Sequence, residues 1–190
     1  MRVSEIPPYV FSGAVRRFWR TLDQQAAKQK HRGTAADHGR RAAVTGGAQM
    51  DGFCSQITKL LTESGVRPAS VYTKRRTTDL PGFFRATKDW DLVGVEEGRL
   101  IAIVELKSQV GPSFGNNLNN RTEEALGSSE CFWTAYREGA FGTSPQPWLG
   151  FLLLLEHCPE SIRPVSVREP HFEVLPEFFF FKQKTAYEIL

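Results

Sequence analysis

Residues 90–107 constrain the fold more than any other part of the 190-residue chain. They read as two short apolar strands joined by an acidic turn that ends in Gly98. Side chains alternate along a strand, so Glu105 and Lys107 should point to one face and the leucine between them to the other. If the two strands pair, Asp91, which opens the first strand, approaches the same face.

Two carboxylates and an ammonium group at one sheet edge suit a divalent metal and a phosphodiester. Mg²⁺ prefers oxygen ligands and keeps several waters, so one or two carboxylates are sufficient. Asp91 and Glu105 are the candidate metal ligands, and the backbone carbonyl of Leu106 is a further oxygen donor. Lys107 is the candidate to orient or help deprotonate the attacking water and to offset phosphate charge.

Two alternatives stay open at this point. Asp89 competes with Asp91 for the role of first ligand, and Asp91 is preferred because it abuts the apolar run that follows it. A Glu-x-Lys sequence after an apolar run also commonly marks only the solvent side of a strand end. The Asp fourteen positions before Glu105, with a tight hairpin between them, favours the metal-site interpretation.

The rest of the chain predicts an α/β fold with a mixed β-sheet flanked by helices. Apolar residues at helical spacing predict helices, and a Gly at position 65 is a plausible cap for the second of them. Loops are expected at 31–48 and, rich in Gly and Asn, between the central strands and the third helix, with a turn at 79–82. The expected helices lie at about 9–30, 48–64 and 122–138, and the expected strands at about 71–73, 90–96, 99–106 and 148–156.

The charge of the chain is divided unevenly. Residues 1–88 hold 16 Lys or Arg against 6 Asp or Glu, a net +10, whereas residues 89–190 hold 8 against 15, a net −7. A basic half beside an acidic half fits a polyanion-binding surface next to a metal-binding one, although chance clustering of solvated charges gives the same numbers.

Two groups of residues around the central strands are candidates for DNA contacts. Phosphate contacts need cationic or amide groups, and Asn or Arg side chains suit base readout in the major groove. A solvated basic loop is an equal alternative for the cations, and capping of the next helix is an equal alternative for the amides. The candidates are Lys74, Arg75, Arg76, Arg85, Lys88, Asn116, Asn117 and Arg121.

Other features limit the class of protein. The three cysteines and four histidines are scattered, so neither a disulfide framework nor a zinc ribbon is supported. No apolar run is long enough to span a membrane and no signal peptide is visible, which predicts a cytoplasmic location. We expect residues 1–177 to form a single nuclease domain. Residues 178–190 resemble the translation of a sequencing adapter, and we expect a non-native tail there that replaces natural sequence.

Longer runs of sequence resemble the XhoI family of type II restriction endonucleases, within the PD-(D/E)xK nuclease superfamily. The similarity extends over about residues 10–177, although Trp90 stands where the superfamily motif has proline. The runs that carry it are Val44–Gly47, Asp89–Leu92, Glu105–Asn117, Arg121–Ala125, Phe132–Gly142 and Arg168–Phe172.

The resemblance implies a Mg²⁺-dependent homodimer that cuts double-stranded DNA at the palindrome CTCGAG. It also implies that Asp91 and Glu105 bind metal and that Lys107 is catalytic. The tail after Glu177 departs from the family, so dimerisation, stability and activity of this chain are expected to suffer. A DNA-binding protein without catalysis and a structure-specific repair nuclease of the same fold are the alternative functions.

Overall fold

A four-stranded sheet in the order β1-β4-β5-β6 forms the centre of the molecule. The structure is a computed structural model and describes residues 7–31, 48–111, 114–163 and 171–172. The pairs β1–β4 and β4–β5 are antiparallel and β5–β6 is parallel, so the sheet is mixed, as predicted. The strands are β1 (Val71–Tyr72), β4 (Leu92–Glu96), β5 (Arg99–Gln109) and β6 (Trp148–Leu155).

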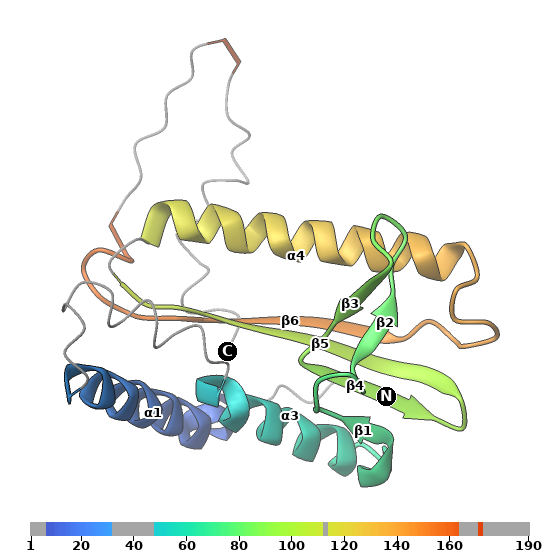
Figure 1. The fold of residues 1–190 in the computed structure, drawn as a ribbon, viewed down its shortest axis with the longest axis horizontal. Helices are drawn as coiled ribbons and strands as arrows, with labels where there is room; N and C mark the ends of the chain where they lie inside the picture. The colour runs from blue at the N-terminus through green and yellow to red at the C-terminus, as the bar shows by residue number, and fades with distance from the viewer. Residues whose placement is uncertain (1–6, 32–47, 112–113, 164–170, 173–190) are drawn as a thin grey trace.

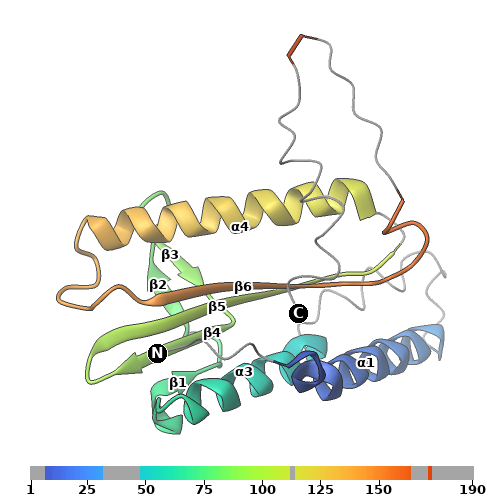
Figure 2. The ribbon, with the colours of Figure 1, turned by 180° about the vertical axis from the view of Figure 1, so that it is seen from behind.

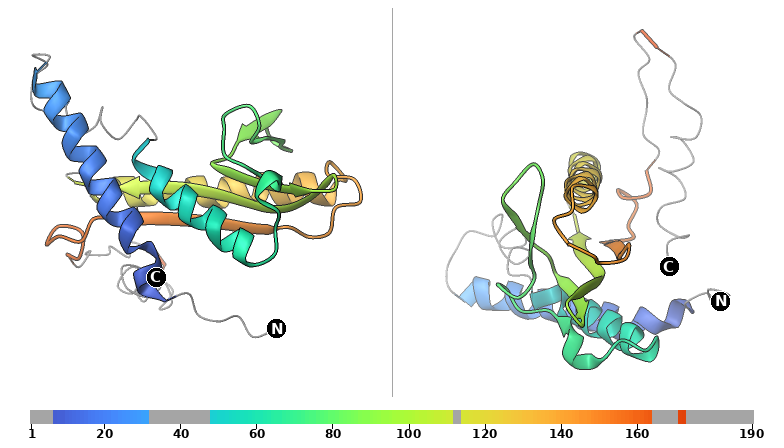
Figure 3. Two further views of the ribbon diagram at one scale, coloured as in Figure 1. Left: turned by 90° about the horizontal axis from the view of Figure 1, so that it is seen from below. Right: turned by 90° about the vertical axis from the view of Figure 1, so that its right-hand side faces the viewer.

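Helices cover both faces of this sheet (Figure 1). Helices α1 (Ser12–His31) and α3 (Asp51–Glu63) lie on one face, and α4 (Phe114–Arg137) runs along the other. Figure 2 shows the same three layers from behind, and in Figure 3 α1 crosses beneath the sheet. Short 3₁₀ turns at Pro8–Phe11 and Ala48–Met50 precede α1 and α3, and a third, Pro68–Ser70, precedes β1. None of the described helices has the length and apolar character that a membrane span requires.

Each face of the sheet has its own apolar core. On the first face, Leu92, Val104 and Leu106 pack against side chains of α1 and α3, such as Phe18 and Phe53. Strand alternation therefore sends Glu105 and Lys107 to the α4 face, opposite to Val104 and Leu106. The core on that second face contains buried residues from the central strands and the helix, and its members are Trp90, Val93, Leu100, Ile103 and Phe132.

The hairpin of β4 and β5 has two features that fix its register. Its two-residue turn, Glu97-Gly98, has positive φ at both positions (52° and 74°), the conformation of the turn that best matches strand twist. The pairing also shifts between Gly94 and Val95, because Gly94 faces Ala102 whereas Val95 faces Leu100. One residue of β5, Ile101, is therefore unpaired, and this bulge places Leu100 and Ile103 in the same core despite their odd spacing.

A small second sheet stands beside α4 (Figure 1). It consists of β2 (Asp79–Pro81) and β3 (Thr87–Asp89), which pair antiparallel. The sequence predicted only a turn at 79–82, because strands of three residues that contain Pro81 and two aspartates show no apolar alternation.

The third helix begins earlier than predicted. Helix α4 starts at Phe114, inside the segment predicted as a polar loop, rather than at residue 122. Asn and Gly each weaken a helix by less than about 1 kcal/mol, which local packing can offset. Here Gln109 Nε2 donates to the Phe114 carbonyl at 2.5 Å, and the Phe114 ring lies against Gly111. The other predicted helices are confirmed within a few residues, and Gly65, at φ +103°, follows the end of α3 as expected.

Candidate active site at the end of the central hairpin

Asp91 lies where the pairing between β4 and β5 ends. The last pair of the ladder is Leu92 with Val104. Beyond it the Asp91 N–H donates to the Val104 carbonyl at 3.2 Å, and Asp91 Oδ2 accepts the Leu106 N–H at 2.7 Å. The side chain thus replaces the next backbone partner of β5. The N–H and C=O of one strand residue point to the same side of the strand. The Leu106 carbonyl therefore points to the side of β5 on which Asp91 lies.

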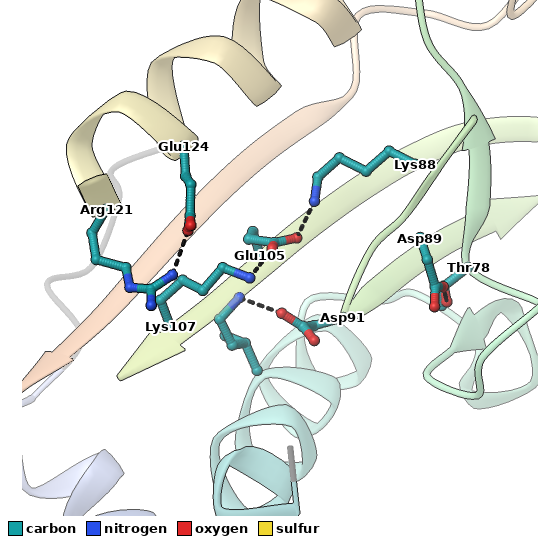
Figure 4. A network of polar contacts seen from close by, with 9 residues as sticks. Thr78, Lys88, Asp89, Asp91, Glu105, Lys107, Arg121 and Glu124 are labelled. Atoms are coloured by element: carbon teal, nitrogen blue, oxygen red, sulfur yellow. Dashed lines mark hydrogen bonds and ion pairs between the residues drawn. The ribbon is translucent and has the colours of Figure 1, made fainter. Parts of the chain in front are cut away.

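Glu105 is buried and held by two lysines (Figure 4). Glu105 is only 4% exposed, and each oxygen of its carboxylate forms an ion pair with a lysine. Lys88 Nζ lies 2.9 Å from Oε2, and Lys107 Nζ lies 2.5 Å from Oε1. A buried carboxylate needs such partners, because an unpaired charge would lose its hydration without compensation.

The pKa of the Asp91 carboxyl reflects its burial and its charged neighbours. Burial raises the pKa of the Asp91 carboxyl above its usual value, and this effect outweighs the hydrogen bond from the Leu106 N–H. The Glu105 carboxylate raises the pKa further, and Lys107 and Lys88 oppose it. Two negative carboxylates that lie close together in a partly buried site favour the binding of a cation between them.

Lys88 joins the second sheet to this site. It belongs to β3, and its side chain is only 15% exposed. Its ammonium lies 4.5 Å from the centroid of the Trp90 ring, a cation–π distance, and Trp90 in turn packs edge to face on Phe132 of α4. The hairpin β2–β3 therefore contributes a cation to the carboxylate of the main sheet.

A pocket of about 300 Å³ opens between this cluster and α4. Its floor carries Glu105 and Lys107, and the hairpin contributes Lys88 and Arg85. Figure 4 shows Arg121 and Glu124 of α4 facing Lys107 of β5. Arg121 Nη1 forms an ion pair with Glu124 Oε2 at 2.5 Å. The helix provides the opposite wall, with Glu123, Glu124, Gly127 and Ser128.

Most of the helix wall was missed from sequence. Glu123, Glu124 and Ser128 were predicted only as helix residues, although Arg121 was proposed for DNA. A signal existed in the spacing: positions 121, 124 and 128 are three and four apart and therefore share one helix face. Its use required knowledge of which face of α4 turns to the sheet.

The structure separates the two competing aspartates. Asp89 Oδ1 accepts the Thr78 hydroxyl at 2.5 Å, and its other oxygen lies 3.9 Å from Arg75. Figure 4 shows it turned away from Glu105, whereas Asp91 lies beside Glu105. Asp89 lines a different pocket of about 460 Å³ together with Arg75, Arg76 and Asp79.

The candidate DNA-contact residues fall into three places. Lys88 and Arg85 line the pocket and Arg121 lies beside it, whereas Lys74, Arg75 and Arg76 are exposed on the loop between β1 and β2. Asn116 and Asn117 are in the first turns of α4, and their side chains lie outside the described part of the structure. The predicted loop at 31–48 and the tail at 178–190 lie outside it almost entirely.

The residues present fit a small oxygen-liganded cation. Among the described residues no group of three or more His, Cys, Asp and Glu forms a metal cluster. A cation that keeps several waters does not need one, and two carboxylates with a backbone carbonyl match the preference of Mg²⁺. Asp91 retains one oxygen that the Leu106 N–H does not occupy, and Glu105 would exchange a lysine for the cation.

A mixed sheet with a carboxylate before one strand and Glu-x-Lys on the next defines the restriction-endonuclease-like class of nuclease fold. Residues 28–190 match the family model described as restriction endonuclease XhoI. The chain belongs to the XhoI family of restriction endonucleases.

Curated relatives agree with this assignment. The type II restriction enzyme BstVI of Geobacillus stearothermophilus is 55% identical over 158 residues, which cover 80% of this chain and 70% of the relative. AbrI of Azospirillum brasilense is 46% identical over 84% of this chain and 71% of its own. XhoI of Xanthomonas vasicola is 42% identical over 93% and 70%. No solved structure matches the chain significantly.

Proposed function

We propose that this protein is a type II restriction endonuclease that hydrolyses double-stranded DNA at CTCGAG as a homodimer with Mg²⁺. The observation that carries the proposal is the convergence of Asp91, Glu105 and Lys107 at the end of the β4–β5 hairpin. Their placement follows from strand alternation and from the hydrogen bond between Asp91 and the Leu106 N–H.

Each residue has a role that its position supports. Asp91 and Glu105, with the Leu106 carbonyl, would hold the cation, which when bound activates water and offsets charge on the phosphate. Lys107 is 29% exposed at its side chain, so it can reach both Glu105 and a ligand in the pocket. Its ammonium would orient the attacking water by hydrogen bonding and stabilise the added negative charge of the phosphate.

The remaining candidates would position the DNA. Lys88, Arg85 and Arg121 lie at or beside the pocket and would bind phosphates next to the cleaved bond. Lys74, Arg75 and Arg76 would follow the backbone further away, and Asn116 and Asn117 would approach a groove from the start of α4. A palindromic site is matched by a twofold dimer, because each subunit then meets the same half-site.

The test is cleavage of a plasmid that carries one CTCGAG site, with Mg²⁺ or with EDTA. We expect a single linear product with Mg²⁺ only, and no product from a plasmid in which the site is changed. Glu105→Ala and Lys107→Ala should abolish cutting and retain DNA binding. Random nicking of both plasmids would favour a structure-specific nuclease, and a salt-dependent gel shift without cutting would favour a DNA-binding protein.

A chimera separates a wrong proposal from a defect caused by residues 178–190, the expected non-native tail. Residues 1–177 would be joined to the corresponding C-terminal part of the Geobacillus relative. If the chimera is a folded dimer by sedimentation and still leaves the CTCGAG plasmid intact with Mg²⁺, the proposed function is wrong.

A further inference from the structure

Two phenylalanines stand exposed at the tip of the β2–β3 hairpin. Phe83 is 51% exposed and Phe84 is 70% exposed. Their rings pack edge to face with centroids 5.0 Å apart, so they form one apolar surface rather than two separate contacts. Neither ring belongs to either core of the main sheet.

The backbone that carries these rings is fixed to α4. The Phe83 N–H donates to the Cys131 carbonyl at 3.3 Å, and the Phe84 N–H donates to the Cys131 sulfur at 3.4 Å. Gly82 permits this approach, because a Cβ there would lie 2.9 Å from the same sulfur and 2.9 Å from the Arg85 carbonyl. The tip is thus held in place with its rings in solvent, and little further ordering is needed when a ligand binds.

The tip adjoins the pocket described above. Arg85, the next residue, lines the pocket together with Lys88, Glu105 and Lys107. Figure 3 shows the hairpin rising beside α4, on the same side of the sheet as that helix. A phosphate bound by Arg85 and Lys88 would bring the sugars and bases of the same DNA segment towards the two rings.

We propose that Phe83 and Phe84 form an apolar wedge that contacts an unstacked base step of the DNA beside the cleaved phosphate. Aromatic faces bind bases by stacking without sequence preference, and apolar side chains at a base step bend the duplex. This inference rests on the proposed function. Arg85 directly after the rings, Lys88 further along the same hairpin, and the basic run 74–76 earlier in the chain favour a polyanion over a second copy of this chain. In a twofold contact between two copies of this chain, these cations would lie close to the same cations of the other copy and repel them.

Binding experiments in EDTA, where the DNA stays intact, test the wedge. Anisotropy of a labelled CTCGAG duplex gives the affinity at several salt concentrations. We expect the double variant Phe83→Ala, Phe84→Ala to bind about tenfold more weakly or worse, with an unchanged salt slope, because the lost contacts are apolar. Arg85→Ala should instead flatten the slope by about one unit. Tyr9→Ala, which removes a 75% exposed aromatic ring on the α1 side of the molecule, should change neither.

Fluorescence of 2-aminopurine placed in turn at each position within and beside the site reports unstacking directly. We expect one position to brighten on binding and to stay dark with the double variant. An unchanged affinity of the double variant, or no brightening at any position, would overturn the wedge. A double variant that no longer forms a dimer but binds DNA as before would overturn it too. Specific cutting by the same preparation would then leave the proposed function intact, whereas no DNA binding at all by the folded chimera described above would count against both.

Discussion

Replacing Lys88 by methionine should strengthen binding of a divalent cation to the free protein. Lys88 neutralises Glu105 at 2.9 Å, so a cation that takes the same carboxylate must displace it. Methionine keeps an apolar stem and a polarisable sulfur against Trp90 but carries no charge. Glu105 keeps Lys107 as a partner, so the buried carboxylate is not orphaned in the variant.

The size of the effect follows from the contact. At an effective dielectric of about 20, two unit charges 2.9 Å apart attract by about 6 kcal/mol before desolvation is counted. The net value of a hydrogen bond between charged groups is about 1.5–3 kcal/mol. Removing the competitor should therefore tighten cation binding about 10- to 100-fold, since about 1.4 kcal/mol corresponds to a factor of ten.

Titration with Mn²⁺, in which electron paramagnetic resonance counts the free ion, measures this without DNA. Lys59→Met is the matched control. It removes the same charge from α3, where Lys59 pairs with Glu63 at 3.7 Å and its side chain is 65% exposed. The control should bind Mn²⁺ like the unchanged protein.

An affinity of the Lys88→Met protein within twofold of the unchanged protein would refute the reasoning. It would mean that Lys88 does not compete for Glu105. Weaker binding would also refute it, because Lys88 would then hold Glu105 in the orientation that the cation requires.

Two further predictions concern groups around Asp91. Its raised folded-state pKa means that the folded protein loses stability as pH rises from the ordinary value of 3.8 through that raised pKa. Asp91→Asn keeps an acceptor for the Leu106 N–H, so in EDTA it should be more stable than the unchanged protein at pH 7 and gain little at pH 4. Urea unfolding at both pH values measures this, and an equal gain at both would contradict it. Burial, with help from the Asp91 and Asp51 charges, raises the pKa of the Cys54 thiol to about 11. At pH 8 only about a thousandth of it is thiolate, so iodoacetamide should label Cys54 slowly and faster towards pH 11, as mass spectrometry can follow.

The main sheet and its helices followed from sequence because their signals are local. Apolar spacing places α1 and α3, and a long apolar run places β6. The convergence of Asp91 with Glu105 and Lys107 also follows locally, from alternation along two strands joined by a two-residue turn. These roles remain predictions until cleavage is measured.

Other features depend on contacts between distant segments. The hairpin β2–β3 has no apolar alternation and is fixed by its attachment to Cys131 of α4. The pairing of Lys88 with Glu105 depends on how that hairpin folds over the main sheet. Similarly, Glu124 and Ser128 reach the pocket only because α4 turns that face to β5. The spacing of nearby residues in the sequence predicts none of these three contacts.

The bulge at Ile101 has a consequence for how members of this family can change in length. If one residue were deleted between Gly98 and Glu105 without other change, every later side chain of β5 would turn to the opposite face. Glu105 would then enter the core of α1 and α3, and Leu106 would take its place beside Lys88. Insertions and deletions in this hairpin should therefore persist only when the bulge is gained or lost with them, or when the change stays within the turn. An alignment of active relatives should show this pattern in the segment between their first aspartate and their Glu-x-Lys.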